Sequence, residues 1–225
     1  MEVLSRAQCL MKKLFLLFAF AVPVFALLAI EDSIGVIASS QPFSPPANLP
    51  GKSGYIALNH QGQEKNLCVP TSASMVMELY GEKICPRALK TLSRNQVYHP
   101  DVPFNDFTAT FFNNLIFGIS RMGFRWREVS YPNSLSGMNS GLLEIKRSID
   151  KGRPVLIDTH LYGGHTFVVC GYDDGIQSLI IMDPNIQDPG IRVIKYPDLA
   201  AIWNSLGVGF NGRAALFTAP KNFLP

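Results

Sequence analysis

The order of helical and strand-like segments constrains the fold of this 225-residue chain more than any other feature. Up to about residue 152, apolar residues recur at intervals of three and four, which is the spacing of one helix face. Beyond that point, short apolar runs alternate with turn residues, which is typical of β-strands. Helices that precede an antiparallel sheet indicate an α+β fold.

The same patterns give bounds for each element. Helices are expected over residues 71–80, 86–92, 104–122 and 142–151, with a short strand over residues 124–129. Strands are expected over residues 154–159, 166–172, 176–182, 190–196 and 214–218, with a small helix over residues 199–205.

The N-terminal residues have the pattern of an export signal. Arg6, Lys12 and Lys13 precede the uncharged run of residues 14–30, and a basic segment before an apolar one is typical of a secretory signal. The 17 residues of this run also approach the length of a helix that crosses a ~30 Å hydrocarbon core. Residues 1–38 are therefore expected to be a cleaved signal peptide or an uncleaved anchor, with a buried core helix as the remaining alternative. The first two predict that the rest of the chain is periplasmic or secreted, or is held at the inner membrane.

Composition places one domain after this segment. Residues 39–54 are rich in Ser, Pro, Gly and Asn, which predicts a linker or a loosely docked arm. Residues 55–225 are then expected to form one domain, since about 100–200 residues is the usual size. Hydrophobic residues make up 47% of the chain and charged residues only 16%, so a core is expected and disorder is not.

Charge and cysteine patterns limit the partners. The net charge is only +3 and no basic run is longer than Lys12–Lys13, so the sequence makes no case for nucleic-acid binding. The four cysteines lack paired metal-ligand spacing, which argues against a zinc site. Cys85 and Cys170 are expected to be buried free thiols, with a disulfide between them as the alternative. No cofactor is expected, and membrane contact only through an uncleaved N-terminal segment. The oligomeric state is left open.

Cys68 stands just before the helix expected over residues 71–80. At the start of a helix, unpaired N–H groups and the helix dipole favour an anion, so this position favours the thiolate, the nucleophilic form of cysteine. The same N–H groups can hold the negative oxygen that develops during acyl transfer. Cys68 is therefore a candidate nucleophile, although its position alone also fits a small buried residue or half of a disulfide.

His165 is the candidate base for this cysteine. It follows Gly163 and Gly164 and opens an apolar segment. Two glycines at this point leave room for another backbone or a substrate to approach closely. On its own, such a histidine also fits a structural or exposed role. His160, five residues earlier, is a weaker alternative base. Cys170 alternates to the other face of the strand and is excluded from the site.

Asp183 is expected to orient His165. Residues 172–176 read as a hairpin turn in which Gly175 can take a positive φ. If the hairpin is centred on Asp174, His165 and Asp183 lie nine residues on either side and face each other, with Cβ atoms about 4.5–5.5 Å apart. The carboxylate can then bind one ring nitrogen and leave the other for the cysteine. A bulge at Gly175 would shift this register by one residue, and Asp183 also fits a simple turn cap.

Four stretches carry a family resemblance: residues 66–75 (NLCVPTSASM), 152–156 (GRPVL), 164–173 (GHTFVVCGYD) and 182–184 (MDP). Together they resemble the papain-like cysteine peptidases, and most closely the double-glycine-leader (bacteriocin-processing) peptidase domains and their stand-alone relatives. Their order and spacing match the family over residues 55–196. The resemblance implies a papain-like fold, in which an N-terminal helical part carrying the cysteine packs on an antiparallel sheet carrying the histidine and the aspartate.

The resemblance also implies the roles of individual residues. Cys68 is the nucleophile, His165 the general base and acid, and Asp183 the residue that orients the histidine. The family uses a glutamine five to six residues before the cysteine to bind the oxyanion. Gln63 lies five residues before Cys68 and is preferred, with Gln61, seven residues before, as the alternative.

The expected function is that of an exported thiol hydrolase. It would cleave a peptide or amide bond in a peptide or protein substrate through an acyl-enzyme on Cys68. Two alternatives stay open: an acyltransferase or amidase that uses the same site, and a relative that binds peptides without catalysis. Val69 stands where the family often has glycine, a difference that bears on how a substrate approaches the thiol.

Overall fold

The computed structural model describes residues 53–93, 108–204 and 212–221. The expected signal or anchor over residues 1–38 lies outside these ranges, and so do residues 39–52 of the expected arm. No helix within the described ranges is long and apolar enough to cross a membrane.

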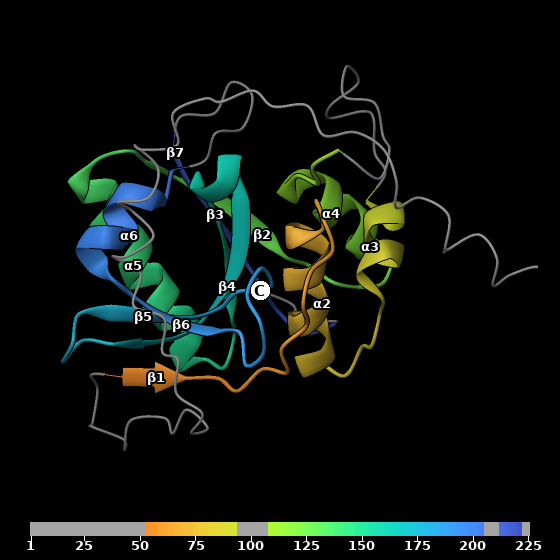
Figure 1. The fold of residues 1–225 in the computed structure, drawn as a ribbon, viewed down its shortest axis with the longest axis horizontal. Coiled ribbons are helices and arrows are strands. Elements are labelled where there is room, and N and C mark those ends of the chain that lie inside the picture. The colour runs from red at the N-terminus through yellow and green to blue at the C-terminus, as the bar shows by residue number, and fades with distance from the viewer. Residues whose placement is uncertain (1–52, 94–107, 205–211, 222–225) are drawn as a thin grey trace, which may run out of the picture. The chain divides into compact units, whose positions relative to one another are not determined.

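A seven-stranded antiparallel sheet forms the centre of the part that the structure describes (Figure 1). Its strands are β1 (Ser53–Tyr55), β2 (Arg127–Pro132), β3 (Val155–Thr159), β4 (His165–Asp173), β5 (Ser178–Met182), β6 (Ile191–Lys195) and β7 (Gly212–Phe217). The order across the sheet is β2-β7-β3-β4-β5-β6, and β1 pairs with β4. Ser53 and Gly54 of β1 pair with Asp173 and Tyr172, so the sheet begins inside the segment expected to be an arm.

Helices cover both faces of this sheet (Figure 1). The first face holds α2 (Cys68–Leu79), α3 (Pro86–Leu92) and α4 (Phe112–Ser120), and the second holds α5 (Leu135–Asp150) and α6 (Tyr196–Ile202). A short 3-10 turn, η1 (Leu161–Gly163), joins β3 to β4. The predicted α+β fold, with the cysteine-bearing helix packed on an antiparallel sheet, is confirmed.

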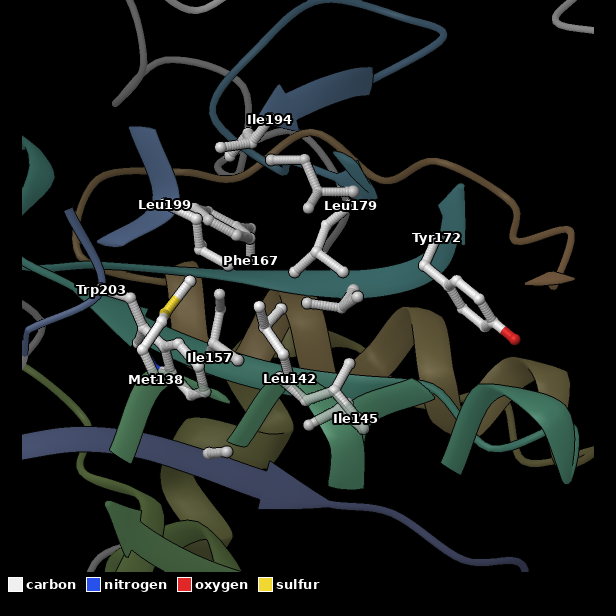
Figure 2. Close-up of a cluster of buried hydrophobic side chains, with 14 of the residues drawn as sticks. Met138, Leu142, Ile145, Ile157, Phe167, Tyr172, Leu179, Ile194, Leu199 and Trp203 are labelled. Carbon is white, nitrogen blue, oxygen red and sulfur yellow. The ribbon is translucent and has the colours of Figure 1, made fainter. Parts of the chain in front are cut away.

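Side chains alternate along the central strands and so fill two cores. Phe167 of β4 lies in the core beneath α5 and α6, with Leu142 and Trp203 (Figure 2). Its neighbour Val168 lies in the opposite core, with Met75 of α2. Because both faces are covered, β4 and β5 are buried almost along their whole length. The strands that lead into the candidate site are therefore held between two packed layers.

The longest helix, α5, begins seven residues before its expected start. The hydroxyl of Ser134 caps it by accepting the N–H of Gly137 at 3.1 Å. Its first turns contain Gly137 and Gly141, although glycine lowers helix propensity. A Cβ at Gly137 would lie 2.1 Å from the carbonyl oxygen of Pro132, and one at Gly141 would lie 2.5 Å from the Trp203 ring. Close packing therefore requires both glycines, and this tertiary effect does not show in the sequence pattern.

The bounds of three other elements also differ from the prediction. α2 begins three residues earlier than expected. α4 begins at Phe112, within the range expected to be helical over residues 104–122, of which residues 104–107 lie outside the described ranges. β2 lies three residues beyond the strand expected over residues 124–129. The other predicted elements start and end within three residues of their predicted bounds, whereas β1 and η1 were not predicted.

Candidate active site

Cys68 is the first residue of α2. The carbonyl of Leu67 accepts the first helical hydrogen bond, from the N–H of Thr71 at 2.8 Å. The N–H groups of Cys68 and Val69 have no partner within the helix, and Pro70 has no N–H to satisfy. The thiol is partly buried and is not in a disulfide. The sulfur therefore lies where the helix dipole favours a negative charge.

His165 and Asp183 are in direct contact. Nε2 of His165 lies 2.7 Å from Oδ1 of Asp183, and the two side chains are only 3% and 1% exposed. His165 opens β4, and Asp183 follows the last residue of β5. Because water is excluded, this charge-assisted hydrogen bond is strong and fixes the orientation of the imidazole.

The register of the hairpin differs from the prediction. Val168 of β4 pairs with Met182 of β5. Continued one residue past β5, this register places Asp183 opposite Phe167, so that His165 becomes a diagonal neighbour on the same face. The prediction that His165 and Asp183 are directly opposed is wrong by two positions. The contact still forms, because a shift of two residues leaves a side chain on the same face of a strand.

Two features of the hairpin, one in β4 and one in the turn, together set this register. The ladder is irregular at Cys170 rather than at Gly175. The turn also holds four residues between Asp173 and Ser178, and Gln177 has the positive φ, 52°, that was expected of Gly175. Neither feature follows from the residue types in the turn.

The surroundings of His165 favour its charged form. Burial lowers the pKa of His165, but hydrogen bonds to Asp183 and Cys68, together with the charges of both, raise it to about 9. Because Asp183 holds Nε2, the ring offers Nδ1 to the thiol. Near neutral pH this raised pKa keeps the imidazole protonated, so the ring has a proton at Nδ1 to give to a reacting group beside Cys68.

Asp183 is kept ionised by several donors. Burial raises the pKa of this carboxyl, but the hydrogen bond and charge of His165, the N–H of Asn185 and the charge of Arg192 lower it below its usual range. The N–H of Asn185 donates to Oδ1 at 2.8 Å, and Nε of Arg192 lies 3.6 Å from Oδ2. Sequence analysis missed Arg192. Its signal is a charged residue between two apolar residues, Ile191 and Val193, in the strand β6.

His60 supports the loop that carries Asp183. Nε2 of His60 donates to the backbone carbonyl of Asp183 at 3.2 Å, and Nδ1 lies 3.4 Å from a carboxylate oxygen of Asp188. Gly190 packs on this ring so closely that a Cβ there would lie 2.0 Å from Cδ2. The carbonyl of Gly190 also accepts the N–H of Asp183 at 2.8 Å. The position of Asp183 is therefore fixed by its backbone as well as by its side chain.

A pocket of about 300 Å³ opens beside Cys68 and His165, and Gln63, Tyr162 and Asn185 also line it. Nε2 of Gln63 donates to Oδ1 of Asn185 at 3.1 Å. A primary amide carries two N–H groups, so one remains for a substrate oxygen. Asn185, which sequence analysis also missed, thus connects Asp183 to Gln63.

Gln61, the alternative oxyanion donor, is held against α2 instead. Its Nε2 donates to Glu78 at 3.0 Å, and its Oε1 accepts from the hydroxyl of Ser74 at 2.9 Å. Its backbone N–H lies 3.3 Å from the sulfur of Met75. Both ends of the amide are engaged away from the pocket, so the geometry favours Gln63.

Tyr162 is a pocket residue with an unusual backbone. Its φ is 55°, its ring lies edge-on to the His165 imidazole with centroids 5.6 Å apart, and 55% of the residue is exposed. Gly163 and Gly164 also have positive φ, and nothing lies within 4 Å of a Cβ at either. No other described segment therefore approaches these glycines closely, while the approach of a substrate stays a prediction. They provide instead the backbone conformation that presents Tyr162 at the pocket.

The other sequence candidates do not line this pocket. Cys170 is buried in the core, where burial raises its pKa to about 12. Cys85 is exposed, contrary to the prediction, and both thiols are free. His160 precedes η1, where its backbone N–H donates to Ile202. Within the described ranges, no group of three or more His, Cys, Asp or Glu residues is arranged to bind a metal.

Known proteins share this fold. The model of a family described as "Peptidase_C39 like family" matches residues 55–209. The peptidase domain of Streptococcus ComA, a bi-functional ABC transporter involved in a quorum sensing pathway, matches with a TM-score of 0.50 at 18% identity, over 73% of this chain and 98% of that one. A double glycine motif protease from an AMS/PCAT transporter, in complex with the leader peptide, matches with a TM-score of 0.50 at 15% identity, over 75% and 95%. No curated protein matches the chain in sequence. The predicted papain-like fold is confirmed.

Proposed function

This chain belongs to the Peptidase_C39-like family, and from that premise we propose that it cleaves a peptide bond through an acyl-enzyme on Cys68. In this proposal His165 is the base and acid, and Asp183 orients it. The observation that carries the proposal is the buried 2.7 Å contact between His165 and Asp183 beside the pocket at the start of α2. A buried ion pair stabilises a fold poorly, because desolvation offsets the attraction, so catalysis explains this one better than folding does.

The reaction proceeds in two halves. The Cys68 thiolate attacks the carbonyl carbon, and the oxyanion accepts hydrogen bonds from the backbone N–H of Cys68 and from Nε2 of Gln63. His165 gives its Nδ1 proton to the leaving amine, which departs and leaves a thioester. His165 then takes a proton from water as that water attacks the thioester, and the acid product leaves with the thiolate and the imidazolium restored.

Compartment and substrate are also part of the proposal. The basic residues ahead of the uncharged run over residues 14–30 support export, either through a cleaved signal or with an anchor at the membrane. A peptide substrate is supported by the AMS/PCAT transporter protease, whose structure holds a leader peptide. The pocket of about 300 Å³ has room for the few atoms on either side of a scissile bond.

Alkylation tests the reactive pair directly. The full chain is treated with iodoacetamide at about pH 6, where an ordinary thiol is almost wholly protonated, and modified cysteines are located by peptide mass spectrometry. Cys68 is expected to be modified first in the wild type, and much more slowly in His165→Ala. Exposed Cys85 is the internal control. If Cys68 is modified no faster than Cys85 in either protein, the proposed nucleophile is wrong. Cleavage of a peptide mixture, with Cys68→Ala as the blank, then tests hydrolysis.

A further inference from the structure

A second hollow, of about 700 Å³, lies between α5, the start of β2 and the end of β7; we call it the basic groove. Five cationic side chains line it: Arg125, Arg127, Arg147, Lys151 and Arg153. Glu144 is the one carboxylate among the described residues that line it, so the lining carries a net charge of +4. Like charges gathered around a hollow repel one another and concentrate a positive potential there. This repulsion opposes folding, whereas an anionic ligand in the hollow would relieve it.

The basic groove is separate from the active-site pocket. Phe217, which lines the groove, ends β7 opposite Val155 at the start of β3. His165 pairs with Thr159 at the other end of β3. Four residues of strand span about 13 Å, and β7 and β4 lie on opposite sides of β3. A ligand in the groove therefore does not occupy the place of the scissile bond.

Some cations of the groove are held in place before any ligand arrives. Arg127 contacts Glu144, and its guanidinium carbon lies 5.1 Å from the centre of the Phe217 ring. Arg125 donates to two backbone carbonyls, at 2.9 and 3.2 Å. Side chains that are already ordered lose less conformational entropy on binding.

An apolar residue stands beside the other cations. Leu143, Arg147 and Lys151 are spaced four residues apart along α5 and its C-terminal cap, so they lie on one side of the helix. Leu143 is 50% exposed, and both cations are exposed as well. The groove thus offers an apolar contact next to positive charges.

We propose that the basic groove binds an acidic peptide segment of a protein partner, with carboxylates at Arg147 and Lys151 and an apolar side chain at Leu143. A peptide supplies both kinds of group within a few residues. Single-stranded nucleic acid is favoured less, because it needs exposed aromatic rings for stacking and Phe217 is only 9% exposed. A membrane surface is also favoured less, because a planar bilayer reaches the rim of a hollow and not its walls.

A binding assay tests this proposal without depending on catalysis. The full chain with Cys68→Ala, which cannot cleave the probe, is titrated in mild detergent into a fluorescent peptide of alternating Glu and Leu. Fluorescence anisotropy then reports binding. Arg147→Gln/Lys151→Gln is expected to weaken binding at least about tenfold, and the matched surface variant Lys83→Gln/Lys195→Gln less than about twofold. Raising the salt from about 50 to about 200 mM is expected to weaken the wild-type complex more than that of the groove variant.

Three further probes decide between ligand classes. A peptide with Gln in place of Glu is expected to bind at least about tenfold more weakly than the acidic peptide. Phosphatidylglycerol vesicles and a single-stranded oligonucleotide are expected to show less dependence on Arg147 and Lys151 than the peptide does. If the groove variant binds the acidic peptide as well as the surface variant does, the proposal is overturned. It is equally overturned if vesicles or the oligonucleotide depend on these cations while the peptide does not.

Discussion

In the active-site pocket the charges of His165, Asp183 and Arg192 are buried and alternate in sign, whereas in the basic groove the charges of Arg147 and Lys151 are exposed and alike. Burial removes the screening by water, so each charge in the pocket fixes the ionisation of the next. In the groove, water and salt weaken every pair. We therefore expect large effects from single changes in the pocket and small, salt-dependent effects in the groove.

The largest effect is expected at the nucleophile. Cys68→Ala removes the attacking atom, so the rate of peptide cleavage should fall by at least about 10⁴-fold. The free energy of unfolding should change by less than about 1 kcal/mol, because the thiol is partly exposed. Cleavage assays and urea unfolding measure the two quantities. Residual activity near that of the wild type would identify a different nucleophile.

The second-largest effect is expected from removing the carboxylate of Asp183. Asp183→Ala leaves the imidazole of His165 without the partner at Nε2, and we expect the cleavage rate to fall by about 10²–10⁴-fold. It also breaks a buried ion pair, which should lower the free energy of unfolding by about 3–5 kcal/mol. Asp183→Asn is the matched variant, since it keeps the shape without the charge. If Asp183→Asn were as active as the wild type, the charge would not matter and the hydrogen bond alone would suffice.

The free energy of unfolding, measured at different pH values, should report on the charges of His165 and Asp183 without any substrate. The pKa of His165 is raised from an ordinary value near 6.5 to about 9. The contribution of its charged form to the free energy of unfolding is therefore complete below about pH 6.5 and is lost as the pH rises through 9. A shift of this size corresponds to roughly 3 kcal/mol. The contribution of Asp183, whose pKa is lowered, is present above about pH 4 and is lost as the pH falls. Both are therefore complete together at about pH 4–6.5.

A matched variant isolates this effect from other ionisable groups. His165→Gln should lose the decline in the free energy of unfolding that the wild type shows between about pH 6.5 and 9. Urea unfolding of both proteins across this range gives the difference at each pH. Parallel curves for the two proteins would mean that the imidazole is not held charged by Asp183 and Cys68.

Features that depend on local patterns could be predicted from the sequence. The pair of His165 and Asp183 was predictable because strand alternation is local and survives a register error of two residues. The position of Cys68 at the start of α2 was predictable, because the apolar residues of that helix recur at helical spacing. These signals also gave the α+β fold and most element bounds.

Features that depend on distant segments were not predictable. The position of Gly141 in α5 is explained by the ring of Trp203, which only the folded chain brings near. The basic groove collects cations from two segments that are twenty residues apart, Arg125–Arg127 and Arg147–Arg153, so no basic run marks it in the sequence. Arg192 likewise reaches Asp183 only because β6 pairs with β5.

A smaller effect on the cleavage rate is expected at Arg192, which acts on Asp183 and not on the substrate itself. Arg192→Met removes a charge that lowers the pKa of Asp183, so this carboxyl should become protonated at a higher pH. The acid side of the pH–rate profile should then move to higher pH, with a fall of up to about tenfold in rate near pH 4 and little change at neutral pH. Arg192→Lys keeps the charge and should restore most of the profile. A uniform loss at every pH in Arg192→Met would indicate a purely structural role.

The smallest effect is expected in the basic groove. Arg147→Gln/Lys151→Gln removes two charges near the end of α5, where cations interact favourably with the helix dipole. It also relieves repulsion among the groove cations. These opposite contributions are each below about 1 kcal/mol at exposed sites, so the free energy of unfolding should change by less than about 1 kcal/mol, and the rate of Cys68 alkylation by less than about twofold.

Because salt screens repulsion, added salt should stabilise the wild type more than the variant. Urea unfolding at low and high salt measures this difference. A loss well above 1 kcal/mol would show that the fold needs these cations, and the contrast between a coupled pocket and a screened groove would then fail.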